Sequence, residues 1–391
     1  MGILISKNRR LFGNEINSLA YINLLVSLAT AAVATIWALY INSFTNSAIA
    51  TGLISGFLTI VSIVAYFAFV PLLEKIDKAN LFAFSLFLIA ISYLIFSINN
   101  SFAILIIISI IMTSLYSLRT ASLGIMIKDK SNTKEISKNE GLMFTFINIG
   151  WVIAPLVAGY IAEKYNFYAV FDISALLILI ALIFFRKSGI NDNIIKRHIN
   201  ANFKKNFKEF FRKKERTISY FINGVSTSWW ILIYLFVPLY MVEYGFSEKH
   251  LGLFVFCVGI PLILCEYYFS KLAGKNGFKK MFRIGFLFVA VTAFLAFFAP
   301  NIYISLLLII IASFGMAMIE PIAQAYFLSI TNNSEMSRFY GPFSTSRDIF
   351  ELLAKIIPSL ALIIFPFKFV FIFFGIIMLV MFFVVSRMGS V

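Results

Sequence analysis

Seven charged residues lie well away from the ends of long apolar stretches of this chain, and their types make them the first candidates for chemistry. They are Arg119, Glu266, Glu320, Arg347, Asp348, Glu351 and Lys355. A charged side chain at the centre of a bilayer costs roughly 2.5–3.5 kcal/mol even on the mildest scale, so each one needs a reason. Buried acids and bases in this setting bind polar solutes, carry protons or pair with one another.

Two of these charges occupy equivalent depths in the two halves of the sequence. Glu320 lies ten residues before the end of its apolar stretch, and Arg119 lies ten residues before Asp129. At 1.5 Å per helical residue, both lie roughly 13–15 Å below the same membrane surface. Arg347 reaches a similar depth in the stretch after Glu320, so we expect the two to meet. Asn148 is the counterpart of Arg347 in the first half.

One apolar stretch carries three charges on a single helical face. Arg347, Glu351 and Lys355 are spaced four residues apart, so Glu351 can pair with a cation one turn above and one turn below. Asp348 lies beside this stripe. One hypothesis is a coupling network, in which protonation of Glu351, or failing it of Asp348 or Glu320, frees a cation for a new partner. The other is a fixed ion ladder that locks this helix into the bundle.

Amide and aromatic side chains within the apolar stretches complete the candidate binding site. They are Asn23, Asn223, Gln324, Trp229 and Trp230. Tryptophan commonly anchors helix ends at the membrane interface, but Trp229 and Trp230 fall in the middle of their stretch. This position is less typical of an interface anchor, so a contact with substrate is a second interpretation beside the structural one.

Twelve apolar stretches must position these side chains. A helix needs about 20 mostly apolar residues to cross the hydrocarbon core of a membrane. Such stretches lie at 15–42, 48–73, 80–98, 102–127, 141–162, 167–185, 217–242, 250–272, 281–299, 301–330, 339–364 and 368–386. The chain is 61% hydrophobic and 13% charged, which excludes an ordinary soluble domain. Because the runs are continuous rather than alternating, we predict an all-α, multi-pass membrane protein with twelve transmembrane helices.

The cations between the stretches predict the orientation. Gaps on one side hold 27 Lys and Arg residues, whereas gaps on the other side hold three. Cytoplasmic loops carry the excess of Lys and Arg, so we predict that both termini and the central loop are cytoplasmic. The same distribution accounts for the net charge of +15 without a nucleic-acid partner.

The chain reads as two six-helix repeats joined by a basic centre. Residues 15–186 and 217–388 each hold six stretches with similar gaps. We predict an N-terminal bundle at 1–186, a cytoplasmic linker at 187–216 and a C-terminal bundle at 217–391. Parallel repeats of this kind place binding sites near the membrane midplane, between the halves. The linker is faintly amphipathic, so it either lies on the anionic inner leaflet or serves as a plain tether.

Two motifs carry a resemblance to a known family. Residues 70–78 read V-P-L-L-E-K-I-D-K, a degenerate form of G-x-L-A-D-R-x-G-R, with Glu74 as the acid and Lys75 and Lys78 as the basic residues. Residues 150–159 match G-x-x-x-G-P-x-x-G-G apart from two Gly to Ala changes. With the twelve stretches and the repeat, the chain resembles the major facilitator superfamily, and its motifs are most similar to those of proton-coupled antiporters. Small residues in the second motif also allow close helix packing, which is a purely structural explanation.

The resemblance implies a secondary transporter that works by alternating access. In this family the first, fourth, seventh and tenth helices line a central cavity, across which Arg119 and Glu320 would face each other. We predict a proton-coupled exporter of a small organic solute. A proton-coupled or facilitative importer of a polar or zwitterionic nutrient, and a lipid flippase of the same fold, are the alternatives.

The resemblance also implies a gate at the cytoplasmic side. The loop after the second helix would place its acid against the start of the eleventh helix, and its lysines would reach the end of the fourth helix. The gate residues are then Glu74, Lys75, Lys78, Asp129 and Arg338.

Other classes of protein lack their signatures in this sequence. His198 and His250 lie in or beside loops, so we predict no metal site and no histidine proton relay. No phosphate-binding loop or zinc-protease motif occurs, so we predict neither a cofactor nor enzyme activity. We expect a monomer in the cell membrane, whose partners are lipids, the solute and protons.

Overall fold

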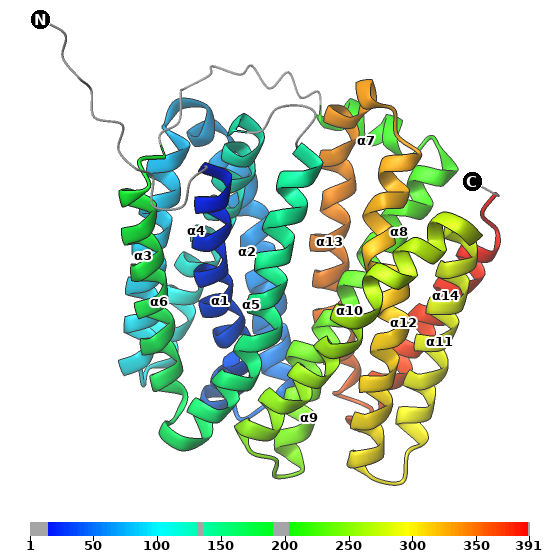
Figure 1. Cartoon of the computed structure of the whole chain (residues 1–391). Helices are drawn as coiled ribbons and strands as arrows, with labels where there is room; N and C mark the ends of the chain where they lie inside the picture. The colour runs from blue at the N-terminus through cyan, green and yellow to red at the C-terminus, as the bar shows by residue number, and fades with distance from the viewer. Residues whose placement is uncertain (1–14, 131–135, 191–202, 390–391) are drawn as a thin grey trace, which may run out of the picture. The chain divides into compact units, whose positions relative to one another are not determined.

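The computed structural model describes residues 15–130, 136–190 and 203–389, and within these ranges the chain forms helices without a β-strand (Figure 1). The first six helices are α1 (Glu15–Thr45), α2 (Ala48–Lys75), α3 (Lys78–Ile98), α4 (Phe102–Lys130), α5 (Ile136–Tyr165) and α6 (Phe167–Lys187). A short helix, α7 (Phe203–Phe210), lies in the predicted linker. The rest are α8 (Lys214–Ile231), the π-helical segment η1 (Leu232–Phe236), α9 (Val237–Glu243), α10 (Glu248–Asn276), α11 (Phe278–Phe298), α12 (Ile302–Ser329), α13 (Asn333–Ala361) and α14 (Phe369–Ser386).

Each predicted span corresponds to one of these helices, and the seventh is formed by α8, η1 and α9 end to end. Within the described residues, 11 spans are long and apolar enough to cross a membrane. The twelfth, α13, has 29 residues, which is sufficient length, but its charged residues make it less apolar than the others. The prediction of an all-α, multi-pass membrane fold is confirmed.

Polar residues in the short connections determine where several helices begin. The side chains of Asp77, Asn166 and Asn301 each accept a hydrogen bond from the backbone N–H three residues later, at 2.8, 3.1 and 3.0 Å. These caps satisfy amide groups that have no partner within the helix. Near a membrane such partners matter more, because few waters are at hand to replace them.

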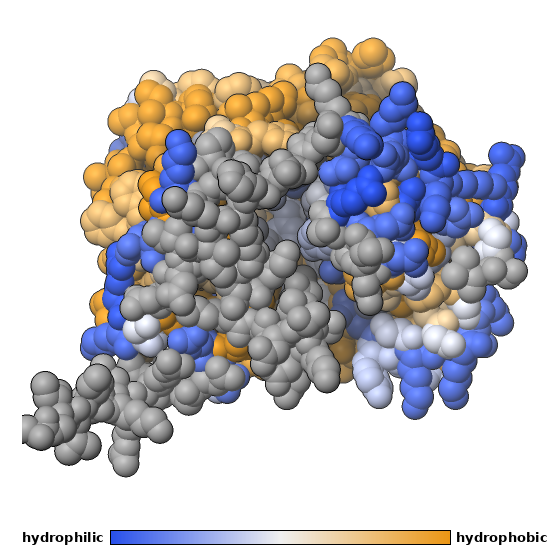
Figure 2. Space-filling view, turned by 90° about the horizontal axis from the view of Figure 1, so that it is seen from above, coloured by the Kyte–Doolittle hydropathy of each residue, from blue (hydrophilic) through white to orange (hydrophobic). Residues whose placement is uncertain are grey.

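Many large apolar side chains are exposed on the outside of the helices. Leu264 is 72% exposed and Tyr267 is 80% exposed, although both lie in the middle part of α10. Seen from the end where α7 lies, hydrophilic residues gather on that face, and a broad hydrophobic flank runs beside it (Figure 2). Exposed apolar flanks on this scale are unfavourable in water and are expected where helices face lipid.

Packing divides the chain into two compact units. Unit 1 comprises Met1–Ala34 and Val61–His198, and unit 2 comprises Thr35–Ile60 and Ile199–Val391. The boundary passes through α1 and α2, so the adjoining halves of these two helices group with the second half of the sequence. The predicted division into two equal bundles remains an inference from the sequence repeat.

In unit 1, small residues let α5 lie close to α1. A Cβ atom added to Gly150 would lie 2.3 Å from the Oγ atom of Ser27, so the larger side chain would not fit without a shift. Ala154 and Ala158, one and two turns later, are also buried. These are small positions of the glycine-rich motif, and their burial supports its packing explanation.

In unit 2, α11 packs against α12 and α14, and α8 packs against α13. The contact of α8 with α13 is close at Gly224, where an added Cβ atom would lie 2.2 Å from the ring of Phe350. Beside it, the buried side chain of Asn223 donates a hydrogen bond to the Oγ atom of Ser346 at 2.7 Å. An amide that finds its partner on a neighbouring helix fixes the rotation of both helices.

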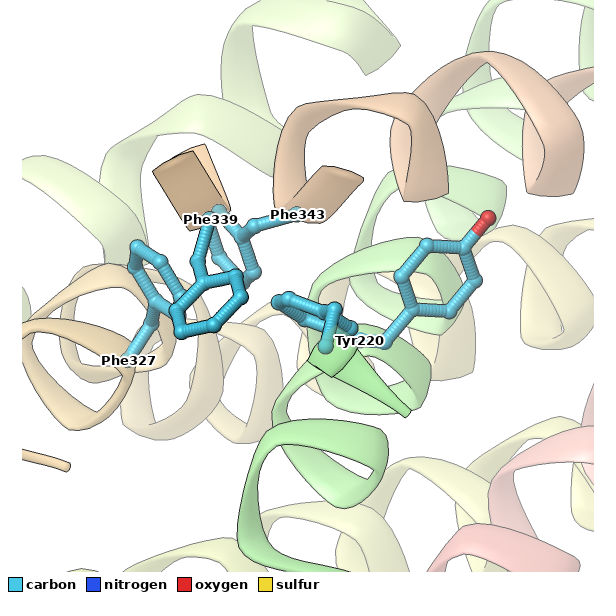
Figure 3. Packing of buried hydrophobic residues seen from close by; sticks show 5 residues of the cluster. Tyr220, Phe327, Phe339 and Phe343 are labelled. Atoms are coloured by element: carbon cyan, nitrogen blue, oxygen red, sulfur yellow. The ribbon is translucent and has the colours of Figure 1, made fainter. Parts of the chain in front are cut away.

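The linker helix α7 is docked on unit 2. Phe210 is fully buried in an aromatic cluster with Tyr220, Phe327, Phe339 and Phe343, which come from α8, α12 and α13 (Figure 3). The rings of Phe327 and Phe343 are stacked at a centroid distance of 4.0 Å. Burial of this aromatic surface holds α7 against three helices of the same unit.

Arg216 on α8 secures the end of α7. Its Nε and Nη2 atoms donate hydrogen bonds to the backbone carbonyls of Phe210 and Glu209 at 3.1 and 2.8 Å. These carbonyls end a helix and would otherwise lack partners. The guanidinium also lies over the ring of Phe339, 4.0 Å from its centroid, and 3.8 Å from the carboxylate of Glu335. The described end of the linker is thus docked on unit 2 through Phe210, and a contact of the linker with the inner leaflet stays a prediction.

Candidate functional site

In unit 1, Arg119 on α4 lies among tyrosines. Its guanidinium carbon is 5.7 Å from the ring centroid of Tyr116, and the hydroxyl groups of Tyr116 and Tyr93 are hydrogen-bonded to each other. The Nε atom of Arg119 is buried and has no hydrogen-bond partner among the described residues. A guanidinium with an unused donor can receive an anionic group. Asn148, predicted at a similar depth, is exposed on α5.

In unit 2, Glu320 on α12 is held by a neutral donor. The indole Nε1 of Trp230 donates to both carboxylate oxygens of Glu320, at 3.1 and 3.2 Å. Among the described residues, no lysine or arginine forms an ion pair with this carboxylate. The charge of an ionised Glu320 is therefore only partly compensated, and a proton or a cationic group can complete the site.

Two further charges lie within electrostatic range of Glu320. Glu266 on α10 repels it, and Arg347 on α13 attracts it without a salt bridge in the described part of the chain. Tyr234, in η1, also interacts with Glu320, and its ring lies 6.0 Å from that of Trp230. Gln324, half-buried, follows Glu320 one turn later. Four helices thus bring two acids, one cation and two aromatic rings together.

The helices that carry this cluster are interrupted beside it. The π-helical segment η1 begins two residues after Trp230 and ends two residues before Pro238. A proline ring clashes with the carbonyl four residues before it, and a wider turn relieves that clash. On α12, Pro321 follows Glu320 and removes a hydrogen bond from the helix backbone. Both interruptions loosen the backbone next to the acid, as is common at functional sites.

The charged stripe on α13 is held by α2. The Oε1 atom of Glu351 accepts hydrogen bonds from the Nζ atom of Lys355 at 2.5 Å and from the Oγ1 atom of Thr59 at 3.2 Å. Lys355 also donates to the Oγ1 atom of Thr59 at 2.9 Å. The helices are in close contact here, because a Cβ atom on Gly52 would lie 1.7 Å from the Oγ atom of Ser359.

The predicted ion ladder on α13 therefore has one pair instead of two. Glu351 bonds to Lys355 one turn below and not to Arg347 one turn above. Arg347 is exposed and acts instead on Glu320 and Asp348. Equal depth in neighbouring helices predicts that Arg347 and Glu320 meet, and the structure brings them into the same region.

Three other predicted candidates make contacts or are buried in ways that point to a structural role. Asn23 donates a hydrogen bond to the backbone carbonyl of Leu19 at 2.8 Å, within its own helix. Trp229 is fully buried, in contrast to its half-buried neighbour Trp230. Arg338 forms an ion pair with Glu209 on α7. The polar contacts of Arg338 and Asn223 join neighbouring helices, whereas that of Asn23 stays within α1.

The predicted gate is only partly described. The side chains of Glu74 and Asp129 lie outside the described residues. Lys75 is exposed at the end of α2, and Lys78 is buried in the first turn of α3. The role of these residues as a gate stays a prediction.

Sequence reasoning missed four hydroxyl side chains at these sites. They are Thr59, Tyr93, Tyr116 and Tyr234. A hydroxyl group carries no charge, so its presence in an apolar stretch does not stand out as an ionised group does. The available signal was spacing: Tyr116 lies one turn before Arg119, and Tyr234 lies one turn after Trp230.

Comparison with known proteins gives one family. A sequence profile described as the Major Facilitator Superfamily matches residues 19–260 and 216–388. The chain is 23% identical over 270 residues to the "Quinolone resistance protein NorA" of Staphylococcus aureus strain MRSA252, and the alignment covers 68% of each protein.

Solved structures agree in fold. A POT family transporter crystallised with 5-aminolevulinic acid superimposes with a TM-score of 0.76 at 12% identity, covering 94% of both chains. The nucleoside transporter NupG gives a TM-score of 0.74 at 13% identity, covering 95% of this chain and 99% of its own. At such identities the likeness concerns the fold alone.

Proposed function

Because this chain belongs to the major facilitator superfamily, a family of membrane transporters, we propose that it exports a small amphipathic aromatic solute in exchange for protons. A relative named for resistance to quinolones, which are aromatic molecules, supports the outward direction. The observation that carries the proposal is the carboxylate of Glu320, which is bound by the neutral indole N–H of Trp230 and by no cation among the described residues.

Glu320 is the proton carrier in this proposal. This changes the order expected from the sequence, in which Glu351 came first. A carboxylate that already has a bonded lysine gains little from a proton, whereas one without such a partner changes its surroundings strongly when it is neutralised. The loss of its charge releases Arg347 from Glu320, while Arg347 still acts on Asp348. Such a local change can bias two arrangements of the helices.

The aromatic groups supply the solute site. Trp230 is half-buried, and its ring lies beside that of Tyr234 in the π-helical segment. Flat apolar surfaces with a few polar groups suit an amphipathic aromatic molecule. Because these rings belong to the same helix that binds Glu320, the occupancy of the solute site and the protonation of the acid are mechanically linked.

The test separates coupling from binding. The full chain is reconstituted in liposomes, and ethidium, a fluorescent aromatic cation, is the probe. Accumulation driven by a pH gradient and exchange of ethidium at equal pH are measured for wild type, Glu320→Gln and Glu163→Gln, an exposed acid at the far end of α5. We expect Glu320→Gln to lose at least roughly tenfold in accumulation and to retain most of the exchange, because the amide imitates the protonated acid.

Two results would overturn the assignment. Full pH-driven accumulation in Glu320→Gln removes this acid as the carrier. Loss of both activities in Glu320→Gln, with both retained in Glu320→Asp, indicates that the carboxylate is needed to bind the solute and not to couple protons. Glu163→Gln is expected to behave as wild type throughout.

Proton-driven uptake of a zwitterionic solute is the second candidate, and one observation favours it. The buried Nε atom of Arg119 lacks a partner among the described residues and could bind a carboxylate of the solute. The same liposomes with the gradient reversed and a radiolabelled dipeptide decide between the two. Uptake that is abolished in Arg119→Gln would favour the importer.

A further inference from the structure

We propose that the groove between α8 and α14, at the end of unit 2 where α7 lies, binds an anionic phospholipid. The inference depends on the membrane fold and not on the exporter proposal. It concerns the outer surface of unit 2 and involves none of the residues of the Glu320 cluster.

The groove is apolar along its length and basic at its rim. It encloses about 350 Å³ and is lined by Ile218, Val380, Phe383 and Val384 between Lys214 and Arg387. Val380 and Phe383 are 53% and 57% exposed, so the groove opens on the flank of the molecule that faces lipid. An apolar groove that is open to the bilayer can bind an acyl chain without desolvating any polar group.

Both rim cations lie at the same level. Lys214 begins α8, Arg387 follows the last residue of α14, and the Nζ atom of Lys214 donates to the backbone carbonyl of Arg387 at 3.3 Å. Both side chains are exposed, and neither forms a salt bridge with an acid within the described residues. Glu215 is next in sequence to Lys214, but the helical turn directs it about 100° away.

More positive charge lies on the other flank of α14. Lys279 donates to the backbone carbonyl of Met388 at 2.5 Å, and the guanidinium of Arg283 lies 5.7 Å from the ring centroid of Phe382. Figure 2 shows hydrophilic residues gathered on part of this end of the molecule. The positive-inside rule assigns this end to the cytoplasmic leaflet, which is the anionic one. Basic pockets between helices at that level are suited to anionic headgroups.

The two cations at the rim of the groove favour an anionic lipid over a zwitterionic one. A lipid phosphate fits between an ammonium and a guanidinium, and its acyl chain fits the furrow below them. A zwitterionic lipid also carries a cationic group, which the rim cations repel, so its binding free energy is less favourable. The bound lipid would bridge α8 and α14 and so stabilise the edge of the unit beside the docked α7.

The test uses the full chain in a neutral detergent. Phosphatidylglycerol and, separately, phosphatidylcholine are titrated, and bound lipids are counted by native mass spectrometry. The variants are Lys214→Gln/Arg387→Gln, Val380→Trp, which fills the lipid-facing furrow, and Lys271→Gln/Lys275→Gln. The last pair is a matched control, because it removes two exposed cations from the end of α10.

We expect wild type to bind phosphatidylglycerol in preference to phosphatidylcholine. Loss of the two rim cations should raise the apparent dissociation constant roughly thirtyfold, since each cation near a lipid surface contributes a factor of roughly five to six. Val380→Trp should weaken binding with the charges intact, and the control pair should bind as wild type. Equal losses in the rim and control pairs would overturn the proposal in favour of general electrostatic attraction. A dimer that Val380→Trp abolishes would overturn it in favour of a second copy of the chain.

Discussion

Glu320 and Glu351 are two carboxylates of unit 2 that lie in apolar helices and are held in opposite ways. Glu351 bonds to Lys355 on its own helix at 2.5 Å and to Thr59 on α2 at 3.2 Å. Among the described residues, Glu320 accepts hydrogen bonds from the indole of Trp230 alone, while Arg347 acts on it from a longer distance. The first acid is part of a closed ion pair, and the second has an open position.

The difference indicates which of the two carboxylates can be protonated at a small cost in free energy. Removing one partner of a closed buried pair leaves an uncompensated charge, so such pairs tend to stay fixed. An acid with a neutral donor and a distant cation can lose its charge without abandoning a partner. We therefore propose a structural role for the contact of α13 with α2 and a coupling role for the Glu320 cluster, and each role can be tested.

The largest expected effect is the difference in pH-driven transport between Glu320→Gln and Glu351→Gln. In pH-driven accumulation of ethidium, Glu351→Gln should stay within about twofold of wild type, because the amide still accepts hydrogen bonds from Lys355 and Thr59. Glu320→Gln should fall at least roughly tenfold. The opposite order of the two variants would restore Glu351 as the proton carrier.

The next effect concerns stability. Lys355→Gln leaves Glu351 without its cation and should destabilise unit 2 by about 1–3 kcal/mol. The estimate is below that for a fully buried pair, because Glu351 is 33% exposed and water screens part of its charge. Thermal unfolding of the full chain in detergent measures the change. The double variant Glu351→Gln/Lys355→Gln should recover most of the loss, and no recovery would contradict the idea of a closed pair.

The smallest effect tests the neutral donor. Trp230→Phe keeps most of the aromatic surface but removes the N–H that binds Glu320, and it should lower pH-driven transport by roughly fivefold, the equivalent of about 1 kcal/mol. Trp229→Phe is the matched control, because the Nε1 atom of Trp229 has no hydrogen-bond partner among the described residues. Equal effects of the two substitutions would show that ring size matters and the hydrogen bond does not.

The positions of the helices were predictable from the sequence. All the predicted spans correspond to observed helices, with ends that agree within a few residues in most cases. This accuracy has a simple cause: the hydrocarbon core demands about 20 apolar residues per crossing whatever the tertiary contacts are. The same cost of burial marks Glu320 and Glu351 as significant from their positions in the sequence alone.

The partners of those charges were decided only by tertiary structure. Spacing along a helix gives the depth of a residue, but the side chain it faces depends on how each helix is rotated about its axis. A step of one residue turns a side chain by about 100°, which is why Trp230 reaches Glu320 while Trp229 is buried elsewhere. The pairing of Lys355 with Thr59 on α2, and the burial of Phe210 from the linker, depend on contacts between segments far apart in sequence. Hydropathy determines which residues enter the membrane, and the packing of one helix surface against another determines what each of them touches.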